Sequence, residues 1–595
     1  MVCVYSYQQL KIVANLPRNA GKCLAIALNT GNVDIVSGET GKMVRHGGED
    51  PFTTDFSASQ PARGAITCLG WGTTMTGSNK NNPSTYKSDP STQVNGGDMS
   101  TEDWYDDLHD DAIDTLVGED TDQNRQTQNA ILNSLPRQLA FIDVESVLPR
   151  LSPIPTRANA GGRYDMFATQ TALDDYFNSM QRTDRLAADV MLVGHEGGHV
   201  RLIVDDILEI SLSPGSRGSS EAANFPVLYT SNLRSPYHAL LCATRDQEES
   251  SNDAKIYRNL SLSLFDIPLL SSGGSHLHLI VSRTAQVRDL CSYITYSILC
   301  AKLDWTTHTN LPSRFMENIN ETLEEKSEGT LDQNLFHLAM TGHYSPTIFE
   351  WLKDELAERG HKRWDHAMTT LYAELSKLLQ TNLLPSLERS ILVATNLRGL
   401  ARYYEGSKRF DVSPEAFTAI ISALGMLQLL VHEAVQILGE EMRQFRAFSK
   451  WLRYVIDIAA ADPESVSAKD MAEREAPHLD YPRVLAYLEG GLTQSRLKPM
   501  VHAGAEQEVG DIEEVQVVEA IHQAREGAAV RKHLLSLQTL SAHLNAVCRA
   551  AHAQILKWQN AAAPSIEVVE LEGGPLSGLG DMRMLSVVRT YRTRP

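Results

Sequence analysis

One five-residue stretch has the residue types of a zinc protease. His195, Glu196 and His199 have the spacing HExxH, in which two imidazoles one helical turn apart bind zinc and the glutamate activates water. That chemistry requires a helix, yet β-type apolar stretches flank the motif, and Gly197 and Gly198 would each cost a helix about 1 kcal/mol. HEGG is instead typical of a hairpin turn. We therefore predict a turn and keep a zinc metalloprotease as an alternative.

Two other stretches contain residue types that bind phosphate or metal. GETGK at 38–42 resembles a phosphate loop, but Val36 stands where its first glycine belongs, and Met43 replaces the hydroxyl residue that ligates magnesium. His276 and His278 share one face of a predicted strand, with no third ligand indicated nearby. We interpret these as a strand turn and as histidines on a sheet face. No catalytic residue, cofactor or bound metal is predicted.

The seven cysteines are scattered, odd in number and without a CxxC pair. Their spacing therefore indicates neither a disulfide framework nor a cysteine zinc site of the RING type. Cys291 and Cys300 fall on different sides of one predicted helix and are expected to be small core hydrophobes.

The composition excludes several classes of partner. The 595 residues carry a net charge of −20, whereas binding to nucleic acid or to an anionic membrane requires a positive face. The first residues do not have the pattern of a secretory signal, and no run of about 18 apolar residues predicts a membrane span. We expect a soluble intracellular protein of a reducing compartment, without a nucleic-acid, membrane or small-molecule partner.

The most regular element that the sequence predicts is one long helix over 413–459. Apolar residues recur in a heptad pattern along it, interrupted only by Glu441. Ser413 is expected to cap its N-terminus, with Pro414 at the first helical position. A helix of roughly 65–70 Å, at about 1.5 Å per residue, is typical of a strut in a bundle.

The region 1–282 has the pattern of short strands separated by Gly, Asn and Thr turns. Strands are predicted at 23–28, 33–37, 66–72, 190–212, 238–245, 261–267 and 276–281. Their spacing, with Trp71 after an apolar strand, resembles the blades of a WD-repeat propeller in degenerate form. Length allows about five blades, so we predict a partial WD-repeat β-propeller.

An acidic insert is predicted within the propeller at 74–129. It is rich in Asn, Ser, Thr, Asp and Gly and has too little apolar content to offset chain entropy, so we expect it to be disordered. It is interpreted as a surface loop. The alternative is that Trp104 and Tyr105, in their acidic surroundings, form a docking motif for a basic partner.

From residue 283 the pattern becomes helical. Helices are expected at 284–326, 346–360, 364–404 and 483–489, besides 413–459. Ser345 is predicted to cap the second, Gly360 to end it, and Pro385 to kink the third. We predict an antiparallel bundle of long helices over 283–510. In 511–595, a helix at 515–560 precedes strands at 566–571 and 582–591 that would return to the propeller.

The bundle region carries a more specific pattern. In 343–403 an SP-capped helix leads to GHKRWD and then to LRGLA, and FRAFSKWLRYV follows at 445–455. The positions concerned are Ser345, Pro346, Trp351, Leu352, Leu356, Gly360, Lys362, Arg363, Trp364, Leu397, Gly399 and Leu400. This pattern resembles the helical long domain of subunit four of the anaphase-promoting complex. FIDVESVLPRLSPIP at 141–155 resembles the WD-repeat region of its fungal members.

The resemblance implies a non-catalytic scaffold in a multisubunit ubiquitin ligase of the cell cycle, in the nucleus and cytoplasm. It implies a place in the platform beside subunits one and five, holding the structure that positions the cullin–RING pair. Family members have propeller strands before and after the stretch that this chain covers, so the propeller is expected to be incomplete here. The rival class is a scaffold of a vesicle coat or nuclear pore.

One group of residues is a candidate partner interface in the bundle. Lys362, Arg363 and Trp364 lie at a predicted corner between two helices. In one interpretation Trp364 packs into the bundle and the two cations cover helix C-terminal carbonyls. In the other, the corner contacts a neighbouring subunit, because Trp and Arg are frequent interface anchors.

Overall fold

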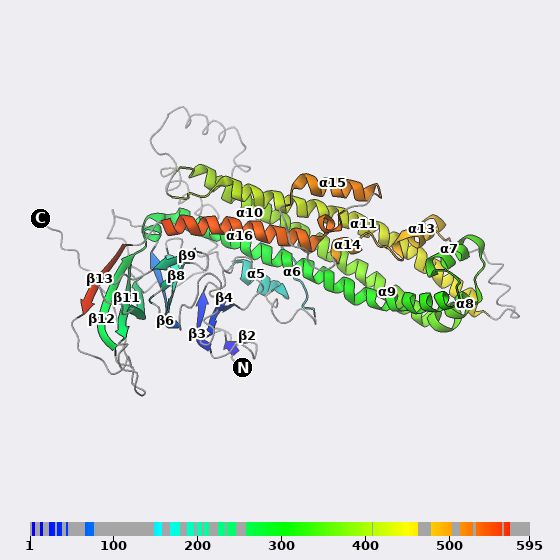
Figure 1. Ribbon diagram of the computed structural model, residues 1–595, viewed down its shortest axis with the longest axis horizontal. Helices are drawn as coiled ribbons and strands as arrows, with labels where there is room; N and C mark the ends of the chain where they lie inside the picture. Colours follow the sequence, from blue (N-terminus) through cyan, green and yellow to red (C-terminus); the bar gives the residue numbers. More distant parts are fainter. Residues whose placement is uncertain are drawn as a thin grey trace, which may run out of the picture. The chain divides into compact units, whose positions relative to one another are not determined.

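The computed structural model describes residues 3–5, 12–15, 23–29, 32–37, 43–45, 66–75, 148–157, 167–178, 187–195, 198, 200–204, 208–212, 224–232, 235–245, 257–406, 409–461, 478–502, 512–527, 531–561 and 565–571. Residues Met1–Ser78 and Arg150–Pro595 form one unit, and Asn79–Pro149 form a second. Within the described residues, long helices are combined with small antiparallel sheets and no closed propeller is present (Figure 1).

The described strands form four sheets in which every pairing is antiparallel and every order is sequential. The first two sheets contain β1 (Cys3–Tyr5) with β2 (Ile12–Asn15), and β3 (Cys23–Asn29), β4 (Asn32–Ser37) and β5 (Met43–Arg45). The third contains β6 (Ile66–Met75), β7 (Ala187–His195), β8 (Val200–Val204) and β9 (Leu208–Leu212). The fourth contains β10 (Asn224–Asn232), β11 (Ser235–Arg245), β12 (Tyr257–Asp266) and β13 (Ser565–Leu571).

The HExxH motif lies at a hairpin, as predicted. His195 ends β7, and β7 pairs with β8 so that Gly194 lies opposite Val200. Gly198 has a φ of 77°, a left-handed conformation that glycine adopts without steric cost. This does not fit the metalloprotease alternative, because His195 belongs to a strand and not to the helix that zinc binding by HExxH requires.

The last described strand belongs to a sheet that begins more than 300 residues earlier. β13 pairs with β12 from Ser565 opposite Asp266 to Leu571 opposite Leu260. The two strands flank the helical part of the chain, from α6 to α16, in the sequence. The helices therefore connect two neighbouring strands of one sheet. The domain limits given above remain a prediction.

The helices are mostly long and near-continuous. The α-helices are α5 (Gln170–Asn178), α6 (Pro268–Glu325), α7 (Leu331–Thr341), α8 (Pro346–Glu350), α9 (Ala357–Lys377), α10 (Leu384–Tyr403), α11 (Pro414–Ala460), α13 (Tyr481–Ala486), α14 (Lys498–Val501), α15 (Glu514–Arg525) and α16 (Leu537–Ala561). Wider π turns are η2 (Trp351–Leu356), η3 (Leu378–Leu383) and η4 (Tyr487–Gly491), and η5 (Lys532–Leu535) is a 3₁₀ turn.

Two local predictions about helices are corrected, and the kink predicted at Pro385 stays a prediction. The stretch 276–281, predicted as a strand, lies inside α6, because its period-2 alternation is too short to outweigh the helical pattern that follows. Gly360 does not end a helix: it is buried within α9. A Cβ atom at this position would lie 3.2 Å from the Leu356 side chain. Pro385 follows the π turn η3, which accommodates its missing amide hydrogen and its ring.

The helices pack in antiparallel order along one another. His361 of α9 contacts Ser449 of α11, and Tyr372 of α9 contacts Phe445 of α11. Because the residue numbers rise along α9 and fall along α11, the two helices are antiparallel. In the same way, α6 contacts α9 through Phe315 and Trp364, and contacts η3 through Tyr293 and Asn382. α16 packs against both α6 and α11 (Figure 1). This order confirms the predicted bundle of long helices.

α11 is the central helix of this core. The Ser413 hydroxyl accepts a hydrogen bond from the Glu415 amide, which confirms the predicted cap. Phe417, Leu424, Val431 and other heptad positions are buried. α11 is also the one helix among the described residues that is long and apolar enough to cross a membrane, with mean hydropathy 1.6 over its most apolar window. Half of that window is buried against other helices, which is typical of a core helix.

Candidate interaction surface and pocket

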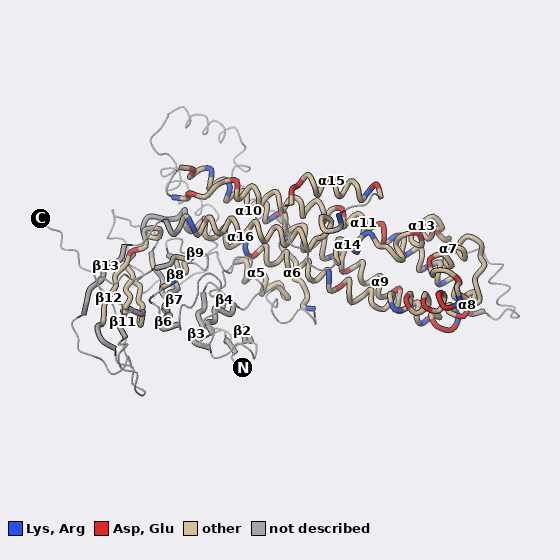
Figure 2. The backbone as a smooth tube through the Cα atoms, viewed as in Figure 1, with Lys and Arg blue, Asp and Glu red and all other residues tan. Residues whose placement is uncertain are grey.

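The three candidate interface residues of the bundle differ in their surroundings. They lie within α9 rather than at a corner between helices. Lys362 is exposed and pairs with Glu358 at 2.6 Å, and Arg363 is also exposed. Charges of both signs accompany them along α6, α8 and α9 (Figure 2). Surface pairs of this kind contribute about 0–1 kcal/mol, so these side chains remain available to a partner.

Trp364 points into the bundle. Its side chain is 2% exposed, and its ring lies 6.3 Å from that of Phe315 and 6.1 Å from that of Phe448. This packing agrees with the first interpretation of the sequence, in which Trp364 belongs to the core. Trp104 and Tyr105 lie outside the described residues.

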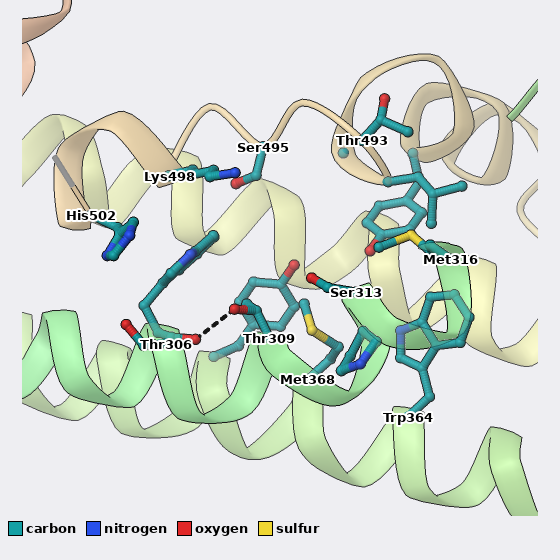
Figure 3. Close-up of a pocket in the computed structure, with 16 residues that line it drawn as sticks. Thr306, Thr309, Ser313, Met316, Trp364, Met368, Thr493, Ser495, Lys498 and His502 are labelled. Atoms are coloured by element: carbon teal, nitrogen blue, oxygen red, sulfur yellow. Dashed lines mark hydrogen bonds between the residues drawn. The ribbon is translucent and has the colours of Figure 1, made fainter. Parts of the chain in front are cut away.

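Trp364 also lines a pocket of about 230 Å³ that the sequence did not reveal. One wall comes from α6 and α9, and the opposite wall from the segment 487–502, which includes α14 (Figure 3). The lining side chains are mostly aromatic, thioether or hydroxyl groups: Trp305, Thr306, Thr309, Pro312, Ser313, Met316, Trp364, Met368, Tyr372, Tyr487, Gly491, Leu492, Thr493, Ser495, Lys498 and His502. The exposed side chains of Thr306, Thr493 and Lys498 mark its opening.

Two buried nitrogens at this pocket have no partner within the described part of the chain. Neither the indole Nε1 of Trp364 nor the imidazole Nδ1 of His502 is hydrogen-bonded. Figure 3 shows the indole nitrogen on the side of the Trp364 ring that faces Met368. An unsatisfied buried polar group costs about 1–3 kcal/mol, so an occupant that supplied a hydrogen-bonding atom would be favoured.

A buried carboxylate fixes the wall of the pocket formed by 495–497. Glu441 of α11 accepts hydrogen bonds from the Ser495 hydroxyl at 2.8 Å, the Arg496 amide at 2.8 Å and the Leu497 amide at 3.2 Å. Burial nevertheless raises the pKa of Glu441, against the lowering effect of these donors. The residue that breaks the heptad pattern thus attaches the pocket segment to the core.

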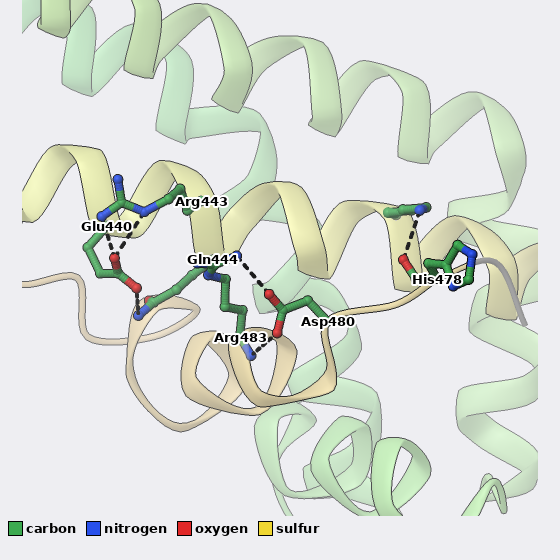
Figure 4. A network of polar contacts seen from close by, with 7 residues as sticks. Glu440, Arg443, Gln444, His478, Asp480 and Arg483 are labelled. Atoms are coloured by element: carbon green, nitrogen blue, oxygen red, sulfur yellow. Dashed lines mark hydrogen bonds and ion pairs between the residues drawn. The ribbon is translucent and has the colours of Figure 1, made fainter.

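A second polar network attaches the preceding segment to the surface of α11. The Arg483 guanidinium pairs with Asp480 at 2.7 Å, and Arg443 pairs with Glu440 on α11 beside it (Figure 4). Lys450 of α11 donates to the carbonyl oxygen of His478 at 3.0 Å. The Lys450 contact and those of Glu441 join the segment 478–502 to α11.

A buried polar junction ties an extended segment, 151–157, to the bundle. The carbonyl oxygen of Ser152 accepts hydrogen bonds from the Tyr293 hydroxyl at 2.5 Å and from the Asn382 amide at 2.8 Å. Asn382 also donates to the Tyr293 oxygen at 2.7 Å. Arg157 pairs with Asp304 at 2.8 Å. We call this segment the strap, because its backbone is held by side chains from α6 and η3.

One cluster contains the residue types of a serine hydrolase but not their order. In a catalytic triad the histidine lies between serine and acid, with one ring nitrogen free to accept the serine proton. Here the Ser449 hydroxyl donates to Asp365 at 2.6 Å, and His361 Nε2 lies 2.9 Å from the Ser449 carbonyl oxygen and 3.0 Å from its hydroxyl oxygen. Because a carbonyl only accepts, Nε2 carries a hydrogen and cannot act as that base. The cluster joins α9 to α11.

The part of the chain that the structure describes contains no metal-binding cluster. No three His, Cys, Asp or Glu side chains come together there in a way that fits an ion. Cys291 and Cys300 lie in the core of the bundle, and the Cys291 sulfur lies 3.7 Å from that of Cys548, without a disulfide.

Comparison with known proteins gives a match that begins in β12 and ends just past α11. A family model described as "Anaphase-promoting complex, cyclosome, subunit 4" matches residues 261–462. Over these residues the helical region is similar to the anaphase-promoting complex subunit 4 family. The matched stretch contains the resemblance at 343–403 and 445–455 that the sequence indicated.

Several proteins with that name are similar to this chain. The one from Schizosaccharomyces pombe is 20% identical over 376 residues, which cover 62% of this chain and 49% of that protein. The one from Homo sapiens is 22% identical over 265 residues, which cover 44% of this chain and 31% of that protein. The one from Mus musculus is 20% identical over 307 residues, with coverages of 51% and 35%. The chain thus spans about half or less of the anaphase-promoting complex subunit 4 proteins it matches.

The sequence pattern identified the helices of the matched region but not the pocket. Its lining residues come from three segments, of which the first and last are nearly 200 residues apart. Thr306, Ser313 and Thr493 are ordinary helix and turn residues, and nothing in their local sequence marks them as neighbours.

Proposed function

We propose that the chain is a non-catalytic scaffold subunit of the anaphase-promoting complex. The observation that carries the proposal is the family match at 261–462, which coincides with the continuous run of packed helices from α6 to α11. Long rigid helices offer extended surfaces, and obligate interfaces of assemblies bury about 2,000 Å² or more. The mechanism is geometric: a rigid subunit fixes the distance between others, and catalysis elsewhere gains from that positioning.

The partners in this proposal are platform subunits one and five, and the compartments are nucleus and cytoplasm. Lys362 and Arg363 contribute to one contact, because they are adjacent, exposed cations on α9 beside the packed core. Arginine is frequent among interface anchors.

The proposal includes a partial β-propeller in the sheet region. Two sheets have four antiparallel strands in sequential order, which is the arrangement of a propeller blade. They approach closely: a Cβ at Gly70 of β6 would lie 2.3 Å from the Tyr229 ring of β10, and one at Gly194 of β7 would lie 2.2 Å from Pro226. Blades of a propeller pack face to face in this way.

The test is affinity purification of the tagged chain from its own cells, with mass spectrometry of the proteins recovered. We expect the large platform subunits, a cullin and a RING protein at matching stoichiometry. The double variant Lys362→Glu/Arg363→Glu should reduce recovery of one neighbour, whereas Lys377→Glu, an exposed position on the same helix, should not.

Recovery of coat or nuclear-pore proteins in place of those subunits would contradict the proposal. Equal recovery with the double variant and with Lys377→Glu would leave the scaffold role intact and remove Lys362 and Arg363 from the interface.

A further inference from the structure

The pocket between α6, α9 and 487–502 has a charge opposite to that of the whole chain. The chain carries 74 acidic and 54 basic side chains, yet the lining of the pocket contains a lysine, a histidine and no carboxylate. Burial lowers the pKa of His502, and the nearby charges of Lys302 and Lys498 lower it further. The end of the pocket at α14 is therefore electropositive and favours an anion.

Two buried carboxylates near the pocket are compensated by partners of their own. Glu441 is 5% exposed, and its two oxygens accept from Ser495, Arg496 and Leu497. Burial, with a further contribution from Glu441, raises the pKa of the pocket residues Tyr372 and Tyr487, so these phenols stay protonated and neutral. Asp304, next to Trp305, pairs with Arg157.

The other end of the pocket is aromatic and apolar. Figure 3 shows Met316, Met368 and Trp364 toward this end of the pocket, away from His502 and Thr306. Rings and thioethers of this kind accept a large apolar side chain of variable shape. The unpartnered indole nitrogen of Trp364 lies at this end and requires a hydrogen-bond acceptor.

We propose that this pocket docks an acidic peptide of a partner protein, with a large apolar side chain beside Trp364, Met316 and Met368 and carboxylates facing Lys498. The positive charge of Lys498 favours an acidic partner. The aromatic and thioether side chains of the same pocket favour a peptide that carries a large apolar residue among acidic ones. A backbone or carboxylate oxygen of the peptide supplies the acceptor for Trp364. The inference concerns the purified chain alone and does not rest on the complex to which it belongs.

The experiment uses fluorescence anisotropy with the full chain and a fluorescein-labelled peptide of sequence DEDFEDEG. Companion peptides are DEDAEDEG, which lacks the anchor, and KRKFKRKG, which reverses the charge. At about 0.15 M salt the Debye length is about 8 Å, so distant surface charges contribute little. We expect saturable binding of the first peptide, with binding of each companion weaker by about tenfold or more.

Variants separate the pocket from general electrostatics. Lys498→Glu should weaken binding of DEDFEDEG by about tenfold. Lys362→Glu makes the same charge change on α9, away from the pocket lining, and should leave binding within about twofold. Trp364→Phe keeps a ring but removes the indole donor and should weaken binding by about threefold. Circular dichroism of each variant checks that the helices are intact.

Three results would overturn the proposal. These are the absence of saturable binding below about 1 mM, equal loss with Lys498→Glu and Lys362→Glu, and equal binding of DEDFEDEG and DEDAEDEG. The last two would indicate a surface charge effect without a pocket. A failed purification of the platform subunits would not produce any of them, so the two proposals fail separately.

Discussion

Glu441 illustrates how a single residue can contradict a pattern and still serve the fold. It stands at a core position of α11, where a leucine would continue the heptads. Its oxygens accept hydrogen bonds from the backbone of Arg496 and Leu497, which have no helical partner there. Burial of a carboxylate is costly, and these donors compensate for part of that cost.

Glu441→Gln is expected to lower the free energy of unfolding by about 1–3 kcal/mol. One acceptor oxygen becomes an amide that faces donors, so a backbone N–H or the Ser495 hydroxyl loses its partner. Denaturant titration of the full chain measures the effect. The control is Glu440→Gln, an exposed neighbour paired with Arg443, which should change stability by less than about 0.5 kcal/mol. Equal effects of the two changes would contradict the role given to Glu441.

The difference in stability between the wild type and Glu441→Gln is expected to depend on pH with a definite sign. Because burial raises the folded-state pKa of Glu441 above 4.5, the native protein holds this proton more tightly than the unfolded chain does. The stability of the wild type relative to Glu441→Gln should therefore fall as pH rises from 4.5 through the folded-state pKa. A difference that increases with pH would show that the hydrogen bonds outweigh burial.

At the scale of elements, the pairing of β12 with β13 joins the two ends of the helical region. β13 pairs only with β12 among the described strands, so the sheet edge depends on a segment that follows α16. Adjacent amides of an edge strand point alternately toward and away from the neighbouring strand.

Proline in β13 is expected to release this strand. Of Val568→Pro and Val569→Pro, one removes an amide that donates to β12, and both restrict the backbone. Hydrogen exchange with mass spectrometry should show faster exchange in 258–266 and unchanged exchange in α11. Val568→Thr retains the amide and β propensity and serves as the control. Protection of β12 that survives both prolines would mean that β13 does not hold this edge.

At the scale of the whole unit, the strap connects a segment from the first third of the chain to the helices. The carbonyl of Ser152 accepts from Tyr293 of α6 and Asn382 of η3, and burial raises the pKa of Tyr293 to about 12. The phenol thus remains a donor at physiological pH. The π turn η3 contains Asn382 and ends two residues before Pro385. The same irregular turn therefore positions Asn382 and accommodates the proline.

Asn382→Ala is expected to loosen the strap and to cost about 2–3 kcal/mol of unfolding free energy, because Ser152 and Tyr293 both lose a buried partner. Hydrogen exchange should increase in 151–157 and 167–178 before it does so in α11. Gln380→Ala, an exposed change on the same turn, is the matched control. An exchange pattern in which α11 and the strap open together would contradict a locally held strap.

The sequence by itself determined the helices and the turns of this protein. Ser345 and Ser413 marked helix starts, the heptads marked the buried side of α11, and HEGG marked a hairpin. Such signals are local, because a cap or turn depends on residues within about four positions. The errors at Gly360 and 276–281 arose where two local signals competed.

Only the tertiary structure decided which distant groups meet. It brought Trp305, Trp364 and Lys498 to one pocket, gave Glu441 its donors, and paired 565–571 with 257–266. These contacts join segments from about 50 to 300 residues apart, and their side chains are unremarkable in their own surroundings. The physical reason is that burial and hydrogen bonding across a core depend on how whole helices and sheets pack, which no local pattern specifies.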